Sequence, residues 1–241
     1  MDIGRQAVTT ALRSGKPLDT CFALIFTAPV YLWCGEWDGA QDVLEQLVNH
    51  SHWPVLKPFH AIAAAVQGAL LIGREDPEQG TPMIQAALQT MRSERQHVIV
   101  TSAACWAAQG LMIAGRSEEA LATIRSARRT AALGAEAVLL PELLRLQAQT
   151  LLSLSDTNEA LAERLLTRSR SIAHGQSALA WELRSALDLA RLRARRGNGV
   201  EARQLLATTY ERFTEGFTTH DLRAATQLLG ELDPFASRAA V

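Results

Sequence analysis

The stretch from Ser177 to Leu232 decides the fold, and it reads SALAWELRSALDLARLRARRGNGVEARQLLATTYERFTEGFTTHDLRAATQLLGEL. Apolar residues recur at helical spacing on both sides of Gly197 and Gly199, which interrupt the pattern. The apolar positions are Leu179, Leu183, Leu187 and Ala190 in the first half, and Ala202, Leu205, Leu206, Thr209 and Phe213 in the second. Neither helix can bury its stripe alone, so each must pack on the other and on a neighbour. The stretch therefore predicts a helix pair followed by a closing helix over residues 219–232.

The same unit recurs along the chain, and its turns show the period. After each turn, a small residue falls in the first turn of the next helix. These residues are Ala40, Gly80, Ala120, Ala160 and Ala202. A period of about 40 residues is typical of helical solenoids, in the range of tetratricopeptide and HEAT-type repeats. The sequence predicts an all-α fold, a right-handed superhelix of tetratricopeptide-like antiparallel helix pairs. One repeat domain is expected over residues 1–233, and a tail over 234–241.

Local signals place individual helices within this array. Asp76 followed by Pro77 predicts a helix start, since aspartate caps and proline suits the first helical position. Trp53-Pro54 is expected to follow a break in the helical pattern and to lead into the next helix. The first helix, over residues 3–14, matches the second helix of a repeat whose first helix is missing. Met1 is therefore interpreted as the start of a fragment.

Composition excludes several classes of protein. The formal net charge is −1, so no global field favours nucleic acid or an anionic membrane. No apolar run reaches the roughly 20 residues that span a bilayer. The longest, from Cys21 to Cys34, is interrupted by Thr27 and Pro29 and predicts a buried helix. These two cysteines and Cys105 are scattered in apolar surroundings, which indicates reduced, buried thiols in a cytoplasmic protein.

Catalytic and metal-binding patterns are missing from the sequence. It contains no G-x-S-x-G, H-E-x-x-H or C-x-x-C motif. Ser14-Gly15-Lys16 is too short for a phosphate-binding loop and is followed by Pro17. His50 and His52 have no nearby cysteine or carboxylate partners, which argues against a metal site. We therefore expect a non-enzymatic chain with no catalytic residue, metal or cofactor.

The most distinctive polar feature is a row of charged side chains on the first helix of the 177–232 pair. Its members are Arg184, Asp188, Arg191 and Arg195, and Arg145 and Gln149 on the preceding first helix extend it. In tetratricopeptide units the first helix lines the concave surface, where such a row could hold an anionic effector or a partner segment. The alternative is a ladder of ion pairs between successive turns that faces water.

Tryptophans and a basic run complete the candidates. Trp33, Trp106 and Trp181 all fall on first helices, where they belong either to the core or to a ligand-anchoring inner surface. The basic run has four members, Arg191, Arg193, Arg195 and Arg196. Positive charge at a helix end complements the helix dipole, and alternate residues point to different sides. The run therefore does not predict a nucleic-acid-binding patch.

Four segments carry a resemblance to a known family. They are Gly175–Arg184 (GQSALAWELR), Pro141–Leu146 (PELLRL), Tyr210–Phe217 (YERFTEGF) and Cys21–Trp33 (CFALIFTAPVYLW). The chain resembles the C-terminal tetratricopeptide-like region of bacterial winged-helix transcriptional regulators and STAND-type signalling ATPases. A similar tail occurs behind some adenylate and guanylate cyclase domains. These are packing motifs, and they carry no chemistry.

The resemblance implies a sensor and interaction arm in signal transduction and transcription regulation. A protein segment or small-molecule effector would bind its concave face, with Trp181 and the charged row as candidate contacts. ATP and DNA would be handled by ATPase and DNA-binding domains of the same polypeptide, in segments absent from this chain. Two alternatives stay open: a free-standing peptide receptor or scaffold, and the tail of a nucleotide cyclase.

Overall fold

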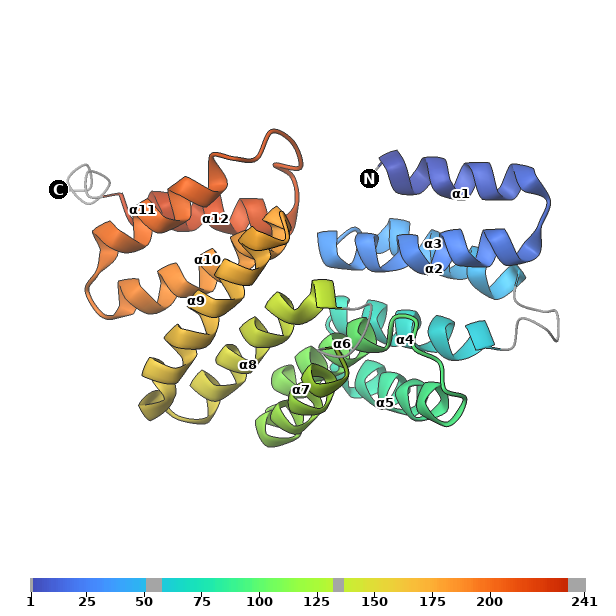
Figure 1. Cartoon of the computed structure of the whole chain (residues 1–241), viewed down its shortest axis with the longest axis horizontal. Helices are drawn as coiled ribbons and strands as arrows, with labels where there is room; N and C mark the ends of the chain where they lie inside the picture. Colours follow the sequence, from blue (N-terminus) through green and yellow to red (C-terminus); the bar gives the residue numbers. More distant parts are fainter. Residues whose placement is uncertain (1, 51–57, 132–136, 234–241) are drawn as a thin grey trace. The chain divides into compact units, whose positions relative to one another are not determined.

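Helices are the only regular secondary structure in the described part of the chain. The computed structural model describes residues 2–50, 58–131 and 137–233, and these form twelve α-helices and two short 3₁₀ helices without any strand (Figure 1). The prediction of an all-α fold is confirmed. The chain divides into two compact units, Met1–Thr123 and Ile124–Val241, with the division inside α7 (Ser117–Ala131). Each unit is described by itself.

The first unit is a stack of helical hairpins. It contains α1 (Asp2–Ser14), α2 (Pro17–Cys34), α3 (Trp37–His50), α4 (Pro58–Gly73), α5 (Pro77–Ser93), α6 (Val100–Ile113) and the beginning of α7. Each helix from α1 to α5 packs on the next one along the chain. The helices α2, α4 and α6 also contact one another in order, so they form one layer of this unit. Every second helix from α2 to α6 therefore belongs to the same layer, and consecutive helix pairs produce this alternation.

The helix ends follow the local signals in the sequence. Gly35 ends α2 in the left-handed region at φ 74°, its N–H donates to the Leu32 carbonyl, and the N–H of Glu36 donates to the Tyr31 carbonyl. Asp76 caps α5 as predicted, with its Oδ1 accepting from the N–H of Gln79 at 3.1 Å. The predicted restart at Trp53-Pro54 and the tail beyond residue 233 lie outside the described residues.

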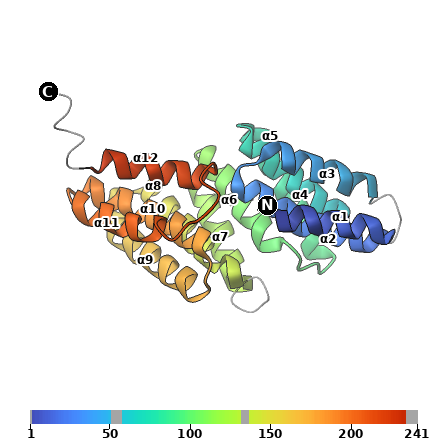
Figure 2. The same ribbon diagram turned by 90° about the horizontal axis from the view of Figure 1, so that it is seen from above.

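The second unit repeats the same alternation. After the 3₁₀ helix η2 (Ala137–Leu139) it contains α8 (Leu140–Leu154), η3 (Asp156–Asn158), α9 (Glu159–Gly175), α10 (Leu179–Arg195), α11 (Gly199–Tyr210) and α12 (His220–Glu231). Figure 2 shows α10 packed between its sequence neighbours α9 and α11. The helix α10 also contacts α8 and α12, so these three helices form one layer of the unit.

Apolar side chains of alternate helices form the core of the second unit. Its central cluster has nine buried members: Leu183, Ala186, Leu187 and Ala190 of α10, Ala202 and Leu206 of α11, and Leu222, Ala225 and Leu228 of α12. A second cluster joins α8, α9 and α10. The predicted helix pair and closing helix are therefore confirmed, and most of the predicted stripe lies in this core. Leu179, Leu205 and Phe213 are only partly buried.

The predicted burial of the cysteines is confirmed for two of the three. Cys21 and Cys105 are buried, Cys34 is half-buried, and all three are free thiols. Burial raises the pKa of Cys21, which keeps this thiol protonated and unreactive.

Candidate functional site

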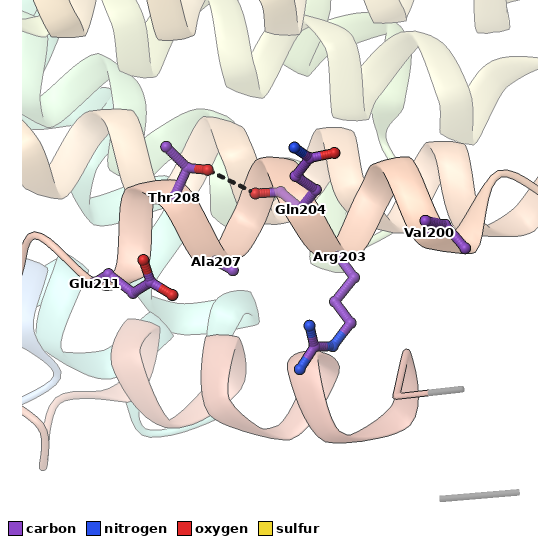
Figure 3. Close-up of a pocket in the computed structure, with 6 residues that line it drawn as sticks. All are labelled: Val200, Arg203, Gln204, Ala207, Thr208 and Glu211. Atoms are coloured by element: carbon purple, nitrogen blue, oxygen red, sulfur yellow. Dashed lines mark hydrogen bonds between the residues drawn. The ribbon is translucent and has the colours of Figure 1, made fainter. Parts of the chain in front are cut away.

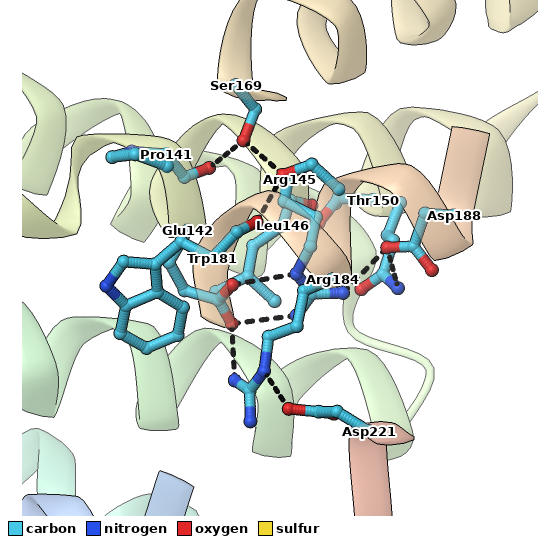
Figure 4. Close-up of polar contacts among 12 residues, drawn as sticks. Pro141, Glu142, Arg145, Leu146, Thr150, Ser169, Trp181, Arg184, Asp188 and Asp221 are labelled. Atoms are coloured by element: carbon cyan, nitrogen blue, oxygen red, sulfur yellow. Dashed lines mark hydrogen bonds and ion pairs between the residues drawn. The ribbon is translucent and has the colours of Figure 1, made fainter. Parts of the chain in front are cut away.

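The charged row of the second unit is a cross-helix network centred on a buried glutamate. Glu142 lies near the beginning of α8, and its side chain has no exposed surface. Both carboxylate oxygens accept from Arg145, whose Nε and Nη2 lie 2.7 Å away (Figure 4). Arg184 of α10 adds a third contact, with Nη1 at 3.3 Å from Glu142 Oε1. One carboxylate is therefore shared by two guanidinium groups from two helices.

The network continues toward the end of α10 through Asp188. Its Oδ2 accepts from Arg145 Nη1 at 2.7 Å and from Gln149 Nε2 at 2.8 Å. Arg191, one turn further along α10, lies 3.5 Å from Oδ1. Two residues of α8 and one of α10 therefore converge on a single aspartate.

Arg184 joins the network to α12. Its Nε donates to Asp221 Oδ2 at 2.6 Å, in the first turn of α12. The guanidinium carbon also lies 5.1 Å from the centre of the Trp181 ring, within the range of a cation–π contact. Because Arg184 contacts both Glu142 and Asp221, it ties all three helices of the layer together.

We call this set the arginine–carboxylate network. Its members are Glu142, Arg145, Gln149, Arg184, Asp188, Arg191 and Asp221. Burial alone would raise the pKa of Glu142, but the charges and hydrogen bonds of Arg145 and Arg184 lower it below its ordinary value. Burial would lower the pKa of Arg145, yet Glu142 and Asp188 raise it well above its ordinary value. Both groups therefore stay charged in the folded protein.

The charge of the network is balanced. Three arginines face three carboxylates, and the Arg145 and Arg184 side chains are only 10% and 12% exposed. An anionic effector would have to compete with carboxylates already in place. The network is a ladder of ion pairs. Some of its pairs join successive turns of one helix, and others join two different helices. Binding of an effector by these residues stays a prediction.

The remaining predicted residues lie around this network. Arg195 is exposed near the end of α10 and lies outside the network. Trp181 is half-buried beside Arg184. In the first unit, Trp106 is buried and packs on Trp33, with ring centres 5.7 Å apart. The core interpretation therefore holds for Trp106.

The basic run at the end of α10 points to two sides, as its spacing predicts. Arg191 approaches Asp188, whereas Arg193 and Arg196 turn toward α9. Arg193 Nε lies 3.1 Å from Glu163, and Arg196 contacts Glu163 at 2.5 Å and Glu159 at 2.8 Å. Carboxylates of the same unit therefore balance these side chains.

Sequence reasoning missed two carboxylates of the network and one apolar surface. Glu142 and Asp221 belong to helices far from Arg184 in the sequence, and spacing along one helix does not reveal them. The apolar surface lies on α2, where Leu18, Phe22, Phe26 and Val30 are exposed at intervals of four residues. We call these four residues the α2 apolar row.

The α2 apolar row corrects the prediction that this segment is a buried helix. The opposite side of α2 is buried in the first unit, with Cys21, Leu24, Ile25 and Ala28 at 0% exposure. Phe26 is 60% exposed and stacks on Phe22, whose ring also meets Phe59 of α4 edge to face. The neighbouring helices cover only one side of α2. The sequence signal was a four-residue spacing of large apolar residues in a helix that is apolar all round.

Among the described helices, α2 alone has a length and mean hydropathy that would allow it to cross a membrane. Those two criteria are also met by core helices of soluble proteins. Since 44% of its residues are buried, its contacts are those of a core helix with one open side.

The structure offers few sites for chemistry elsewhere. A hollow of about 300 Å³ lies along α11. Figure 3 shows six residues that line it, among them Thr208, which donates to the backbone carbonyl of Gln204. Its charged lining residues are Arg203 and Glu211, and the lining holds no nucleophile with an adjacent base. Across the described ranges, no three His, Cys, Asp or Glu side chains gather as metal ligands would. His52 lies outside these ranges.

Comparison with known proteins gives no further guide. Neither a protein-family model nor a curated protein matches this chain.

Proposed function

We propose that this chain is a non-enzymatic protein-interaction and effector-sensing module, built as a superhelix of tetratricopeptide-like helix pairs. The observation that carries the proposal is the α2 apolar row. It places four large apolar side chains in line on one helix, with exposures from 42% to 60%. Contiguous apolar surface of this kind is typical of sites that bind another protein.

The partner that fits this surface is a protein segment with its own apolar stripe. Successive members of the row lie one helical turn apart, about 6 Å along the axis. An amphipathic helix presents apolar side chains at the same interval. It can therefore place one of its apolar side chains between each two neighbouring members of the α2 apolar row. The stacked rings of Phe22 and Phe26 would supply most of the contact area, as aromatic anchors do at interfaces.

The wider setting follows from the resemblance of the four segments described above. It supports a cytoplasmic sensor arm of a bacterial transcriptional regulator or signalling ATPase. Binding of a segment or effector would favour one arrangement of the array over another, and so shift a two-state equilibrium of the regulator. The arginine–carboxylate network ties the layer of helices in the second unit together, which suits such an arm.

Site-specific crosslinking tests the proposal. A photoreactive phenylalanine analogue replaces Phe26, and a matched chain carries it at Val200, which is 76% exposed on α11. We expect position 26 to crosslink one defined protein segment in the host cell, and position 200 not to. The recovered segment is then synthesised and titrated against the purified chain.

The titration decides the outcome. Phe22→Ser and Phe26→Ser should each weaken binding of the segment by about tenfold or more, because each removes a buried aromatic contact. Val200→Ser should leave the affinity unchanged. Equal crosslinking from both positions, or unchanged affinity of the two phenylalanine variants, would contradict the proposal.

A further inference from the structure

A second surface of the Ile124–Val241 unit carries arginines that no carboxylate balances. Arg164 and Arg168 lie one turn apart on α9, and both are exposed. They line an open hollow of about 820 Å³ together with the hydroxyl-bearing residues Thr167 and Ser171. This surface is distinct from the α2 apolar row and from the arginine–carboxylate network.

The one acidic residue in the hollow is already engaged. Glu163 lines it as well, but its two carboxylate oxygens accept from Arg193 and Arg196 of α10. Arg193 and Arg196 therefore already balance the negative charge of Glu163, which does not offset the positive charge of Arg164 and Arg168. Neither of these two arginines forms an ion pair with any residue in the described part of the chain.

A third arginine adds positive charge beside the hollow. Arg128 of α7 donates from Nη1 to Gln147 Oε1 of α8, and its Nε is buried without an acceptor among the described residues. Burial lowers the pKa of Arg128, and the positive charge of Arg168 lowers it further. Two guanidinium groups from α7 and α9 are therefore close enough to repel each other.

This arrangement differs from the rest of the unit. The other arginines that reach between helices here do so toward carboxylates, as Arg145, Arg184 and Arg193 show. Like charges one turn apart on a helix are destabilising, so Arg164 and Arg168 carry a cost that the fold does not offset. An anion placed in the hollow would remove this cost.

The chemistry of the hollow points to an oxyanion. Guanidinium groups present paired N–H donors that match the oxygens of phosphate, and hydroxyl groups donate to the same oxygens. We propose that the α7–α9 surface, formed by Arg128, Arg164, Thr167, Arg168 and Ser171, binds a phosphate group. Arg164, Arg168 and the two hydroxyls would contact it, and Arg128 would act through its charge. The phosphate belongs either to a small molecule or to a phosphorylated side chain.

Titration of the isotope-labelled full chain tests this proposal. Backbone and arginine Nε–H signals are followed by NMR as inorganic phosphate is added at constant ionic strength, with chloride as the balancing anion. Phosphoserine and acetate are titrated in parallel. We expect saturable shifts on α9 with phosphate, and none with acetate at the same concentration. Tighter binding of phosphoserine than of phosphate would identify a phosphorylated side chain as the source, and weaker binding a small molecule.

Matched variants separate a site from general charge attraction. Arg168→Gln should weaken phosphate binding by about tenfold, as loss of a charge-assisted hydrogen bond predicts, and Arg128→Gln should also weaken it. Arg203→Gln removes an exposed arginine of α11 and should change nothing. Linear shifts that chloride reproduces, or Arg168→Gln binding phosphate as the native chain does, would overturn the proposal. Native circular dichroism spectra of the variants exclude misfolding as the cause.

Discussion

Arg145 and Asp188 are separated by 43 residues in the sequence, yet Nη1 of the first lies 2.7 Å from Oδ2 of the second. The same guanidinium contacts Glu142 through its other two nitrogens. Each of its three nitrogens therefore makes a bond within α8 or from α8 to α10. A buried arginine in this position determines how the two helices pack.

Replacing Arg145 by methionine should destabilise the protein strongly. The substitution keeps much of the side-chain volume but leaves the buried Glu142 with Arg184 as its remaining cationic partner. We expect a loss of about 3–5 kcal/mol in the free energy of unfolding, measured by urea titration, because a buried carboxylate that loses its main cationic partner is costly. Arg191→Met is the control, since Arg191 approaches the same Asp188 from a half-exposed position. It should cost less than about 1 kcal/mol. Equal losses in the two variants would show that burial of the pair is unimportant.

The stabilisation by Glu142 should disappear in acid. Its pKa in the folded protein is lowered below the ordinary value of 4.5, so its contribution is complete above that value. It is lost as the pH falls through the pKa of the folded state. The difference in unfolding free energy between the native chain and Glu142→Gln should therefore be large at neutral pH and shrink below pH 4.5. Urea titrations at several pH values measure it. Glu118→Gln, at an exposed position, should show a small difference at every pH. A difference for Glu142→Gln that stays constant down to about pH 3 would contradict the lowered pKa.

Periodicity along one helix predicted much of the network but not its centre. The spacing of Arg184, Asp188 and Arg191 shows that they share one side of α10, because these positions follow the helical repeat. It cannot show which residues of α8 and α12 meet them, since that depends on how the helices cross. Glu142 and Asp221 entered the network only through tertiary packing.

The same limit explains the incorrect prediction for α2. The apolar content of this segment correctly predicted a helix and a buried side around Leu24 and Ile25. The share of α2 that its neighbours cover depends on the packing of the whole unit. In this unit the packing leaves Phe26 exposed. Likewise, the unbalanced charge of Arg164 and Arg168 became visible only once the partners of Glu163 were known. The cap of α5 was predictable because its cause is local, the side chain of Asp76.

A buried chain of hydroxyl groups should contribute to the second unit. Ser169 of α9 donates to the Pro141 carbonyl of α8 at 2.6 Å, and its oxygen lies 2.6 Å from the Ser185 hydroxyl of α10. Ser169→Ala would leave that carbonyl without its donor, so we expect a loss of about 1–3 kcal/mol in unfolding free energy. Ser93→Ala is the control, because it removes a similar hydroxyl-to-carbonyl bond at an exposed helix end. Urea titration of both variants measures the difference. If Ser169→Ala were no more costly than Ser93→Ala, the buried bond would have no special role.

Close packing of α4 on α5 should make Gly68 irreplaceable. A Cβ atom on Gly68 would lie 2.6 Å from the backbone oxygen of Gly80, and backbone cannot move aside as a flexible side chain can. Gly68→Ala should therefore force the two helices apart and cost at least about 1–3 kcal/mol, although alanine is the better helix former. The matched substitution is Gly230→Ala in α12, where no atom lies within 4 Å of the added Cβ. There the higher helix propensity of alanine should raise stability by about 0.5–1 kcal/mol. Thermal unfolding followed by circular dichroism measures both variants. Because the chemical change is the same, stability changes of opposite sign would assign the loss at Gly68 to packing. A gain in stability at both positions would show that α4 and α5 are not held at this distance.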